Sequence, residues 1–183
     1  SDLIWSYVVN NYVKGKAPLP FDLLYWNADS TRMPEANHSF YLPNCYLDNN
    51  LAKGKMVLGN VKLDLKKVKV PIFNLATRED RIAPALSVFE GSSKFGGPVD
   101  YVLAGSGHIA GVVNPPGKKA KYGFRTGAQA KGKFQDWVQA ATEHEGSWWP
   151  YWFGWLEAQA PERVPARIPG EGALPSLGPA PGT

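Results

Sequence analysis

The sequence lacks several features that would assign it to a common class of protein. It has a single cysteine, Cys45, which excludes an internal disulfide framework and makes a reducing cytoplasm the simplest expectation. No apolar run approaches the roughly 18–20 residues of a membrane-spanning helix, and no secretory signal opens the chain. With 20 basic and 16 acidic residues the net charge is only +4, which gives no argument for nucleic acid as a partner.

Two further absences concern chemistry. No three residues show metal-ligand spacing, so we expect no metal. No G-x-S-x-G or G-x-C-x-G nucleophile elbow occurs in the 183 residues. Cys45 lies in a helical pattern rather than a strained strand-to-helix turn, and is expected to be a small buried hydrophobe. Ser106 is too close to His108 in the chain to be its nucleophile.

The stretch 68–108 predicts an α/β fold. Residues 68–76 and 99–104 are β-rich apolar runs joined by a helical segment, which predicts two parallel strands with a right-handed crossover. Asp80 and His108 each follow one of these strands, at the sheet edge where open α/β sheets place their reacting groups. An acid and a histidine side by side there suggest two members of a nucleophile–histidine–acid triad.

Each candidate also has a plainer interpretation. Asp80 could be a helix N-cap, and His108 a loop histidine bonded to a backbone carbonyl. As a pair at adjacent strand ends, catalysis is the favoured interpretation, with Glu79 as the alternative acid. His38 and His144 have no matching context, although His144 follows a predicted helix and is placed to cap its carbonyl groups.

The rest of the chain divides into three parts. Residues 1–52 are expected to form a helical cap or lid, 53–160 the α/β core, and 161–183 a Pro/Gly-rich tail. The predicted elements outside the two strands are helices at 3–13 and 35–51, the latter interrupted by Pro43, a hairpin at 55–65, a basic glycine-rich loop at 118–133, and helices at 134–143 and 152–159.

Two side-chain groups leave alternatives open. The tryptophans of 148–155 are most simply core packing; the alternative is a hydrophobic surface facing a polymer or a partner subunit. The basic residues of 118–133 are most simply a solvated loop; the alternative is attraction of a phosphate-rich acyl carrier. These residues are Trp148, Trp149, Trp152 and Trp155, and Lys118, Lys119, Lys121, Arg125, Lys131 and Lys133.

Four stretches carry a family resemblance. They are PFDLLYWN at 20–27, RED at 78–80, GSGHIAGVVNPP at 105–116 and GSWWP at 146–150. They resemble the carboxyl-terminal part of the catalytic domain of class I polyhydroxyalkanoate synthases, the poly(3-hydroxybutyrate) polymerases. The resemblance extends from residue 1 to about residue 170. Arg81, Pro43 and Glu145 depart from the family pattern, and Arg81 is expected to lower the pKa of Asp80.

The resemblance implies an α/β-hydrolase fold, of which this chain supplies the last parallel strands and part of a helical cap. It implies an acyltransferase that polymerises 3-hydroxyacyl-CoA with release of CoA through a cysteine, His108 and Asp80, without a cofactor. The family's cysteine lies upstream and has no match here, since Cys45 falls in the cap-like region. The implied partners are 3-hydroxyacyl-CoA, the cytoplasmic polyester granule surface and a second copy bound through the cap.

Two rival interpretations remain open. A hydrolase of the same fold, an esterase or polyester depolymerase, would need a serine elbow outside this chain. A non-catalytic granule-surface or subunit-interaction module would use the Trp-rich end. We interpret the chain as a piece of a longer protein, and we expect it to be inactive and poorly soluble alone because a sheet edge meant for burial would be open.

Overall fold

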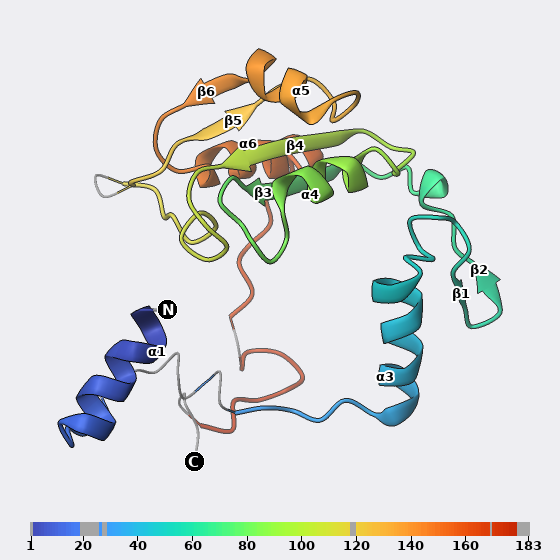
Figure 1. Ribbon diagram of the computed structural model, residues 1–183. Helices are drawn as coiled ribbons and strands as arrows, with labels where there is room; N and C mark the ends of the chain where they lie inside the picture. Colours follow the sequence, from blue (N-terminus) through green and yellow to red (C-terminus); the bar gives the residue numbers. More distant parts are fainter. Residues whose placement is uncertain (1, 19–25, 27–28, 118–119, 169, 179–183) are drawn as a thin grey trace. The chain divides into compact units, whose positions relative to one another are not determined.

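The computed structural model describes residues 2–18, 26, 29–117, 120–168 and 170–178. The chain divides into two compact units, Ser1–Asn49 and Asn50–Thr183, whose elements are labelled in Figure 1. Of the PFDLLYWN stretch at 20–27, only Trp26 is among the described residues.

The first unit is helical. Helix α1 (Asp2–Tyr7) continues directly into the π-helical turn η1 (Val8–Val13). Gly15 follows with a φ of 59°, a left-handed conformation that glycine adopts without steric penalty. The helix predicted at 3–13 is therefore confirmed, and Gly15 follows its end.

The second helical segment changes its hydrogen-bond pattern at Pro43. Helix α3 (Glu35–Tyr41) gives way to the π-helical turn η2 (Leu42–Leu47), which has the proline in its first turn. Because proline has no N–H, it cannot continue the α-helical ladder. The predicted interruption is confirmed, although the helix ends at Leu47 rather than at 51. Cys45, expected to be buried, is only partly buried in η2.

The second unit begins with the predicted hairpin. Strands β1 (Val57–Leu58) and β2 (Val61–Lys62) pair antiparallel. Gly59 and Asn60 between them have φ values of 53° and 63°. Positive φ at both central residues is the type I′ geometry that glycine and asparagine favour.

A four-stranded sheet of order β3-β4-β5-β6 forms the centre of this unit. Strands β3 (Ile72–Thr77) and β4 (Val99–Ala104) are parallel and joined by helix α4 (Ala85–Ser92). This confirms the predicted strand–helix–strand and the α/β class.

Two short strands were not predicted. Strand β5 (Phe124–Thr126) pairs antiparallel with β4, and β6 (Thr142–His144) pairs antiparallel with β5. Three residues are too few to show a period-two pattern, so the first was mistaken for loop and the second for the end of a helix. Helix α5 (Phe134–Ala140) accordingly stops before the predicted residue 143.

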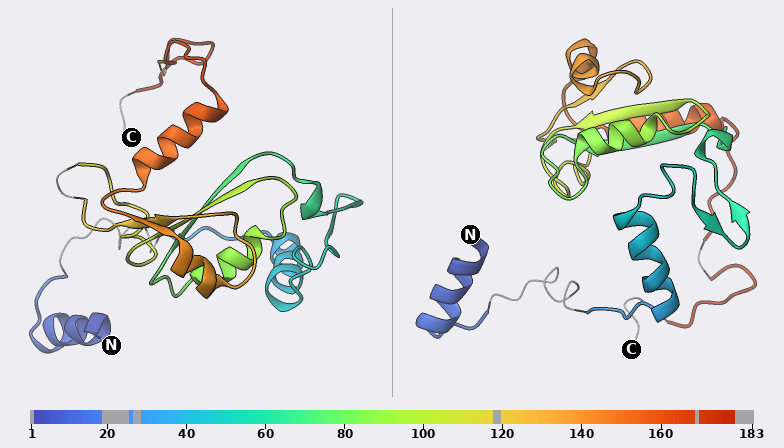
Figure 2. Two further views of the ribbon diagram at one scale, coloured as in Figure 1. Left: turned by 90° about the horizontal axis from the view of Figure 1, so that it is seen from above. Right: turned by 45° about the vertical axis from the view of Figure 1, so that its right-hand side comes forward.

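Alternate residues of β4 face two different cores. Tyr101 and Leu103 belong to a cluster with α4 and α5, whereas Val102 and Ala104 belong to a cluster with helix α6 (Trp149–Gln159). Figure 2 shows α4 and α6 on opposite faces of the parallel pair. Trp148 is buried in the second core, with Trp149 and Trp152 packed against it, which supports core packing for this part of the tryptophan group.

Beyond α6, neither 161–168 nor 170–178 contains a helix or strand. Across the described parts of the chain, every helix is too short or too polar to span a bilayer.

Candidate active site

The loops that follow β3 and β4 are joined beyond the ends of the strands. The backbone N–H of Arg78 donates to the carbonyl of Ala104 at 2.8 Å, and that of Glu79 donates to the carbonyl of Ser106 at 2.9 Å. Ser106 has a φ of 67°, an uncommon conformation for a residue with a side chain. The parallel pairing therefore fixes the two loops against each other where Asp80 and His108 emerge.

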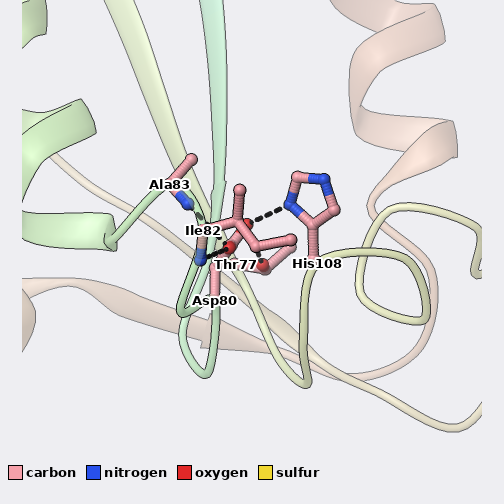
Figure 3. A network of polar contacts seen from close by, with 5 residues as sticks. All are labelled: Thr77, Asp80, Ile82, Ala83 and His108. Carbon is pink, nitrogen blue, oxygen red and sulfur yellow. Dashed lines mark hydrogen bonds and ion pairs between the residues drawn. The ribbon is translucent and has the colours of Figure 1, made fainter. Parts of the chain in front are cut away.

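Asp80 and His108 meet within bonding distance. Nδ1 of His108 lies 2.7 Å from Oδ2 of Asp80. Figure 3 draws this contact between the two side chains. The histidine side chain is 50% exposed and the aspartate side chain only 7%. The geometric prediction is therefore confirmed: an acid and an imidazole meet across neighbouring parallel strands. Their catalytic role stays a prediction.

The Asp80 carboxylate also organises its own loop. Oδ1 accepts hydrogen bonds from the backbone N–H groups of Ile82 and Ala83, at 2.8 and 2.9 Å, and Oδ2 accepts one from Oγ1 of Thr77 at 3.3 Å. All these contacts are drawn in Figure 3. The helix α4 itself begins only after Pro84. The N-cap of α4 is Pro84, so the N-cap interpretation of Asp80 is wrong. Oδ1 of Asp80 instead closes the turn before the helix, and Oδ2 contacts His108.

These contacts lower the pKa of Asp80 from 3.8 to about 2. The largest cause is the hydrogen bond from the backbone N–H of Ala83, followed by the one from His108, while burial opposes them. An ionised carboxylate can only accept hydrogen bonds, so the proton of this contact belongs to Nδ1 of His108. Nε2 is then the basic nitrogen, on a half-exposed ring.

Arg81 does not act as predicted. Its side chain is exposed, none of the ion pairs formed by described residues includes it, and the causes of the lowered pKa of Asp80 do not include it. The pKa of Asp80 is lowered, but by backbone N–H groups and His108. Glu79, the alternative acid, instead pairs with Arg78 at 3.2 Å.

The segment after His108 is held by the start of α6. Nε1 of Trp148 donates to the carbonyls of Gly111 and Val112, both at 3.2 Å, and Nε1 of Trp149 donates to Val112 at 3.0 Å. The two motifs most specific to the resemblance, GHIAGVVNPP and GSWWP, are therefore in direct contact. Sequence patterns alone did not reveal this contact, because the partners are 36 or 37 residues apart.

Gly111 packs where no side chain fits. A Cβ at this position would lie 2.4 Å from the carbonyl oxygen of Gly105 and 2.6 Å from Cγ2 of Thr77. The His108 loop is therefore pressed against the end of β3.

A cavity of about 300 Å³ opens beside the strand ends. Lys121 and Arg125, two of the six basic residues of 118–133, line it. Arg125 is held by the carboxylate of Glu143 at 2.9 Å and the carbonyl of Val138 at 3.1 Å. Lys118 and Lys119 lie outside the described residues.

His144 does not cap a helix. It lies in β6, with Nε2 2.8 Å from Oγ1 of Thr126 and its ring stacked on Phe124 at a centroid distance of 4.7 Å. The prediction failed because the helix before it ends at Ala140 and the backbone then becomes extended. Within the described ranges, no three potential ligands gather as a metal centre.

The fold and the site define an α/β protein whose histidine is oriented by an ionised carboxylate at the carboxyl ends of parallel strands. No family model matches the chain. It is 84% identical over 183 residues to the poly(3-hydroxyalkanoate) polymerase of Methylorubrum extorquens, and 62% identical over 183 residues to the poly(3-hydroxyalkanoate) polymerase subunit PhaC of Rhizobium meliloti. It is 40% identical over 185 residues to the PhaC subunit of Cupriavidus necator.

All three alignments cover 100% of this chain and 30–31% of the relative. The chain therefore spans about 30% of the length of the curated relatives it matches. The resemblance is confirmed: the chain is homologous to a segment of the poly(3-hydroxyalkanoate) polymerases.

Proposed function

We propose that this chain is the C-terminal part of the α/β-hydrolase core of an acyltransferase that polymerises 3-hydroxyacyl-CoA into polyhydroxyalkanoate and releases CoA. The observation that carries the proposal is the 2.7 Å contact between His108 and Asp80. It supplies an oriented base in a chain whose relatives are named as polymerases.

In the first half of the proposed reaction, Nε2 of His108 takes the proton of a cysteine thiol that lies outside this chain. The thiolate attacks the thioester carbonyl of 3-hydroxyacyl-CoA, and the carbon–sulfur bond to CoA breaks. The proton on Nε2 passes to the departing CoA thiolate. Asp80 remains ionised and stabilises the imidazolium that forms in between.

In the second half, Nε2 takes the proton of the 3-hydroxyl group of an acyl unit. The hydroxyl oxygen attacks an acyl thioester, an ester bond forms, and the departing thiolate takes back the proton. One histidine thus serves both steps, which requires a ring that substrate can reach. The 50% exposure of His108 supports this requirement.

The remaining parts of the proposal rest on the resemblance. Residues 1–52 would belong to a cap that also contributes to a homodimer, residues 161–183 would be a tail, and the protein would work at the cytoplasmic surface of the polyester granule. CoA enters as part of the substrate, and no cofactor is needed.

The test uses a protein of the relatives' full length that carries this segment. His108→Ala should reduce CoA release from 3-hydroxybutyryl-CoA by about 10³-fold or more, and Asp80→Asn by about 10²–10⁴-fold. Glu79→Gln is the matched control, because Glu79 is the adjacent acid and contacts Arg78 instead. It should retain nearly full activity.

Each rival makes a different prediction for the same protein. Hydrolysis of polyester without synthesis would identify a depolymerase. Unchanged synthesis by His108→Ala, together with weakened assembly by Trp149→Ala, would identify an interaction module and refute the catalytic proposal.

A further inference from the structure

Five lysines surround a hollow of about 550 Å³ in the second unit. The only acid that lines it is Asp64, whose Oδ1 accepts a hydrogen bond at 3.0 Å from the backbone N–H of Lys66. We call Lys53, Lys62, Lys66, Lys67 and Lys94 the lysine surface. With Asp64 counted against the five lysines, the residues that line the hollow carry an excess of four positive charges.

The lysine surface lies on a fixed segment. The N–H of Gly96 donates to the carbonyl of Leu65 at 3.3 Å, and Nζ of Lys69 donates to the carbonyl of Gly96 at 3.3 Å. A Cβ on Gly96 would lie 1.8 Å from the carbonyl oxygen of Lys66, so the two backbones are in close contact. The segments that carry Lys66, Lys67 and Lys94 are therefore held together by the fold.

These charges have no internal partner among the described residues. None of the ion pairs there involves the lysine surface, and all five side chains are exposed. Like charges held close together repel one another, and an external anion relieves this repulsion.

An apolar element adjoins the lysine surface. The β1–β2 hairpin exposes Val57 (48%), Leu58 (56%) and Val61 (61%), and Val57 is the cross-strand partner of Lys62. No aromatic side chain lines the hollow, so bases of a nucleic acid would have nothing to stack on. Exposed aliphatic groups beside clustered lysines suit a surface with anionic headgroups above an apolar layer.

The lysine surface is separate from the Asp80–His108 site. It precedes the amino ends of β3 and β4, whereas the acid–histidine pair follows their carboxyl ends. Figure 1 shows the hairpin at the end of the unit away from the loops that follow β4. Six residues of strand at roughly 3.3 Å each place about 20 Å between the two sites.

We propose that the lysine surface and the β1–β2 hairpin together dock on an anionic phospholipid surface. The lysines contact headgroup phosphates, and Leu58 and Val61, the cross-strand pair beside the hairpin turn, enter the boundary of the acyl chains. This inference does not depend on the proposed catalytic function.

The test is flotation of the full 183-residue chain on a density gradient with vesicles of phosphatidylcholine alone or with phosphatidylglycerol added, because self-associated chain does not float. We expect binding only to the anionic vesicles, and weaker binding at raised salt. The triple variant Lys62→Gln, Lys66→Gln, Lys67→Gln should bind at least about tenfold more weakly. The control Lys131→Gln, Lys133→Gln removes exposed lysines elsewhere and should bind like the parent chain.

The hairpin supplies a second arm. The double variant Leu58→Ser, Val61→Ser should also weaken vesicle binding about tenfold. Binding of the parent chain to inorganic polyphosphate or duplex DNA is measured alongside, because a general polyanion site is the competing explanation. Equal binding to neutral vesicles, or polyanion binding without vesicle binding, overturns the proposal. So does loss of vesicle binding in a protein of the relatives' full length, since the hairpin is then covered by protein. Near-UV circular dichroism of the tryptophans verifies that each variant is folded. If the triple lysine variant is not folded, the single Lys→Gln variants are tested in its place.

Discussion

The two oxygens of the Asp80 carboxylate have different neighbours. One fixes the turn before α4 through Ile82 and Ala83, and the other orients His108. Because the same charge holds the loop and the imidazole, protonating it weakens both. We therefore expect the turn before α4 and the orientation of His108 to be lost together as the pH falls.

A pH series tests this coupling. The pKa of Asp80 is lowered from 3.8 to about 2 in the folded chain. A lowered pKa means that the carboxylate stabilises the fold above pH 3.8, and that this stabilisation is lost as the pH falls through about 2. We expect urea unfolding followed by tryptophan fluorescence to show a steeper loss of stability over this interval in the parent chain than in Asp80→Asn. Glu79→Gln should follow the parent, and an equally steep loss in Asp80→Asn would contradict the assignment.

Replacing each of the two histidines of the second unit by alanine should change the stability of the fold by different amounts. His144→Ala removes the stacking on Phe124 and the contact with Thr126, and should lower the free energy of unfolding by about 1–2 kcal/mol. His108→Ala removes a half-exposed ring and should cost less. Thermal unfolding of both variants compares them, and a larger loss for His108→Ala would show that its role in the fold exceeds that of His144.

At the scale of elements, the start of α6 anchors the loop that carries His108. Trp148→Phe keeps most of the buried ring but leaves the carbonyls of Gly111 and Val112 without this donor, and should lower the free energy of unfolding by about 1–3 kcal/mol. Trp155→Phe is the control, since Trp155 makes an edge contact with Phe73. Chemical denaturation measures the free energy of unfolding of both variants. Equal losses in Trp148→Phe and Trp155→Phe would mean that the hydrogen bonds of Trp148 add no stability beyond the packing of its ring.

Substitution by alanine at two glycines should change the stability of the fold in opposite directions. Gly111→Ala would place its Cβ 2.4 Å from a backbone oxygen and should destabilise by about 1–3 kcal/mol. Gly91 lies within α4 with nothing within 4 Å of an added Cβ, so Gly91→Ala should stabilise by about 0.5–1 kcal/mol. The melting temperatures should move in opposite directions, and a neutral Gly111→Ala would show that the loop can shift away from β3.

The sequence predicted the elements that are long enough to show a pattern. Strands β3 and β4 have six residues each, and their order around α4 was sufficient to place Asp80 beside His108. Strands β5 and β6, with three residues each, have no such pattern, and their pairing depends on contacts between distant segments. The bonds from Trp148 are likewise tertiary, so motif spacing could not reveal them. The backbone donors to Asp80 are only two and three residues away, and such local contacts are what the N-cap interpretation of Asp80 anticipated.

For the whole molecule, the open side of the sheet is the feature that matters. Among the described residues β3 pairs only with β4, and an unpaired strand is a template for association. We expect sedimentation velocity to show concentration-dependent self-association of the purified chain. Val70→Lys, at an exposed position just before β3, should reduce it through charge repulsion. A monodisperse parent chain would contradict the prediction.

The purified chain lacks part of the machinery that acyl transfer requires. The Asp80–His108 pair can move a proton, but acyl transfer also needs a nucleophile, and the 183 residues contain no elbow to present one. Cys45, the single thiol, lies in a different compact unit from the pair, within the π-helical turn η2. We therefore expect no CoA release from 3-hydroxybutyryl-CoA by the chain alone, and no change on Cys45→Ser. Release that is abolished by Cys45→Ser would make Cys45 the nucleophile and would overturn the assignment of that role to a cysteine outside this chain.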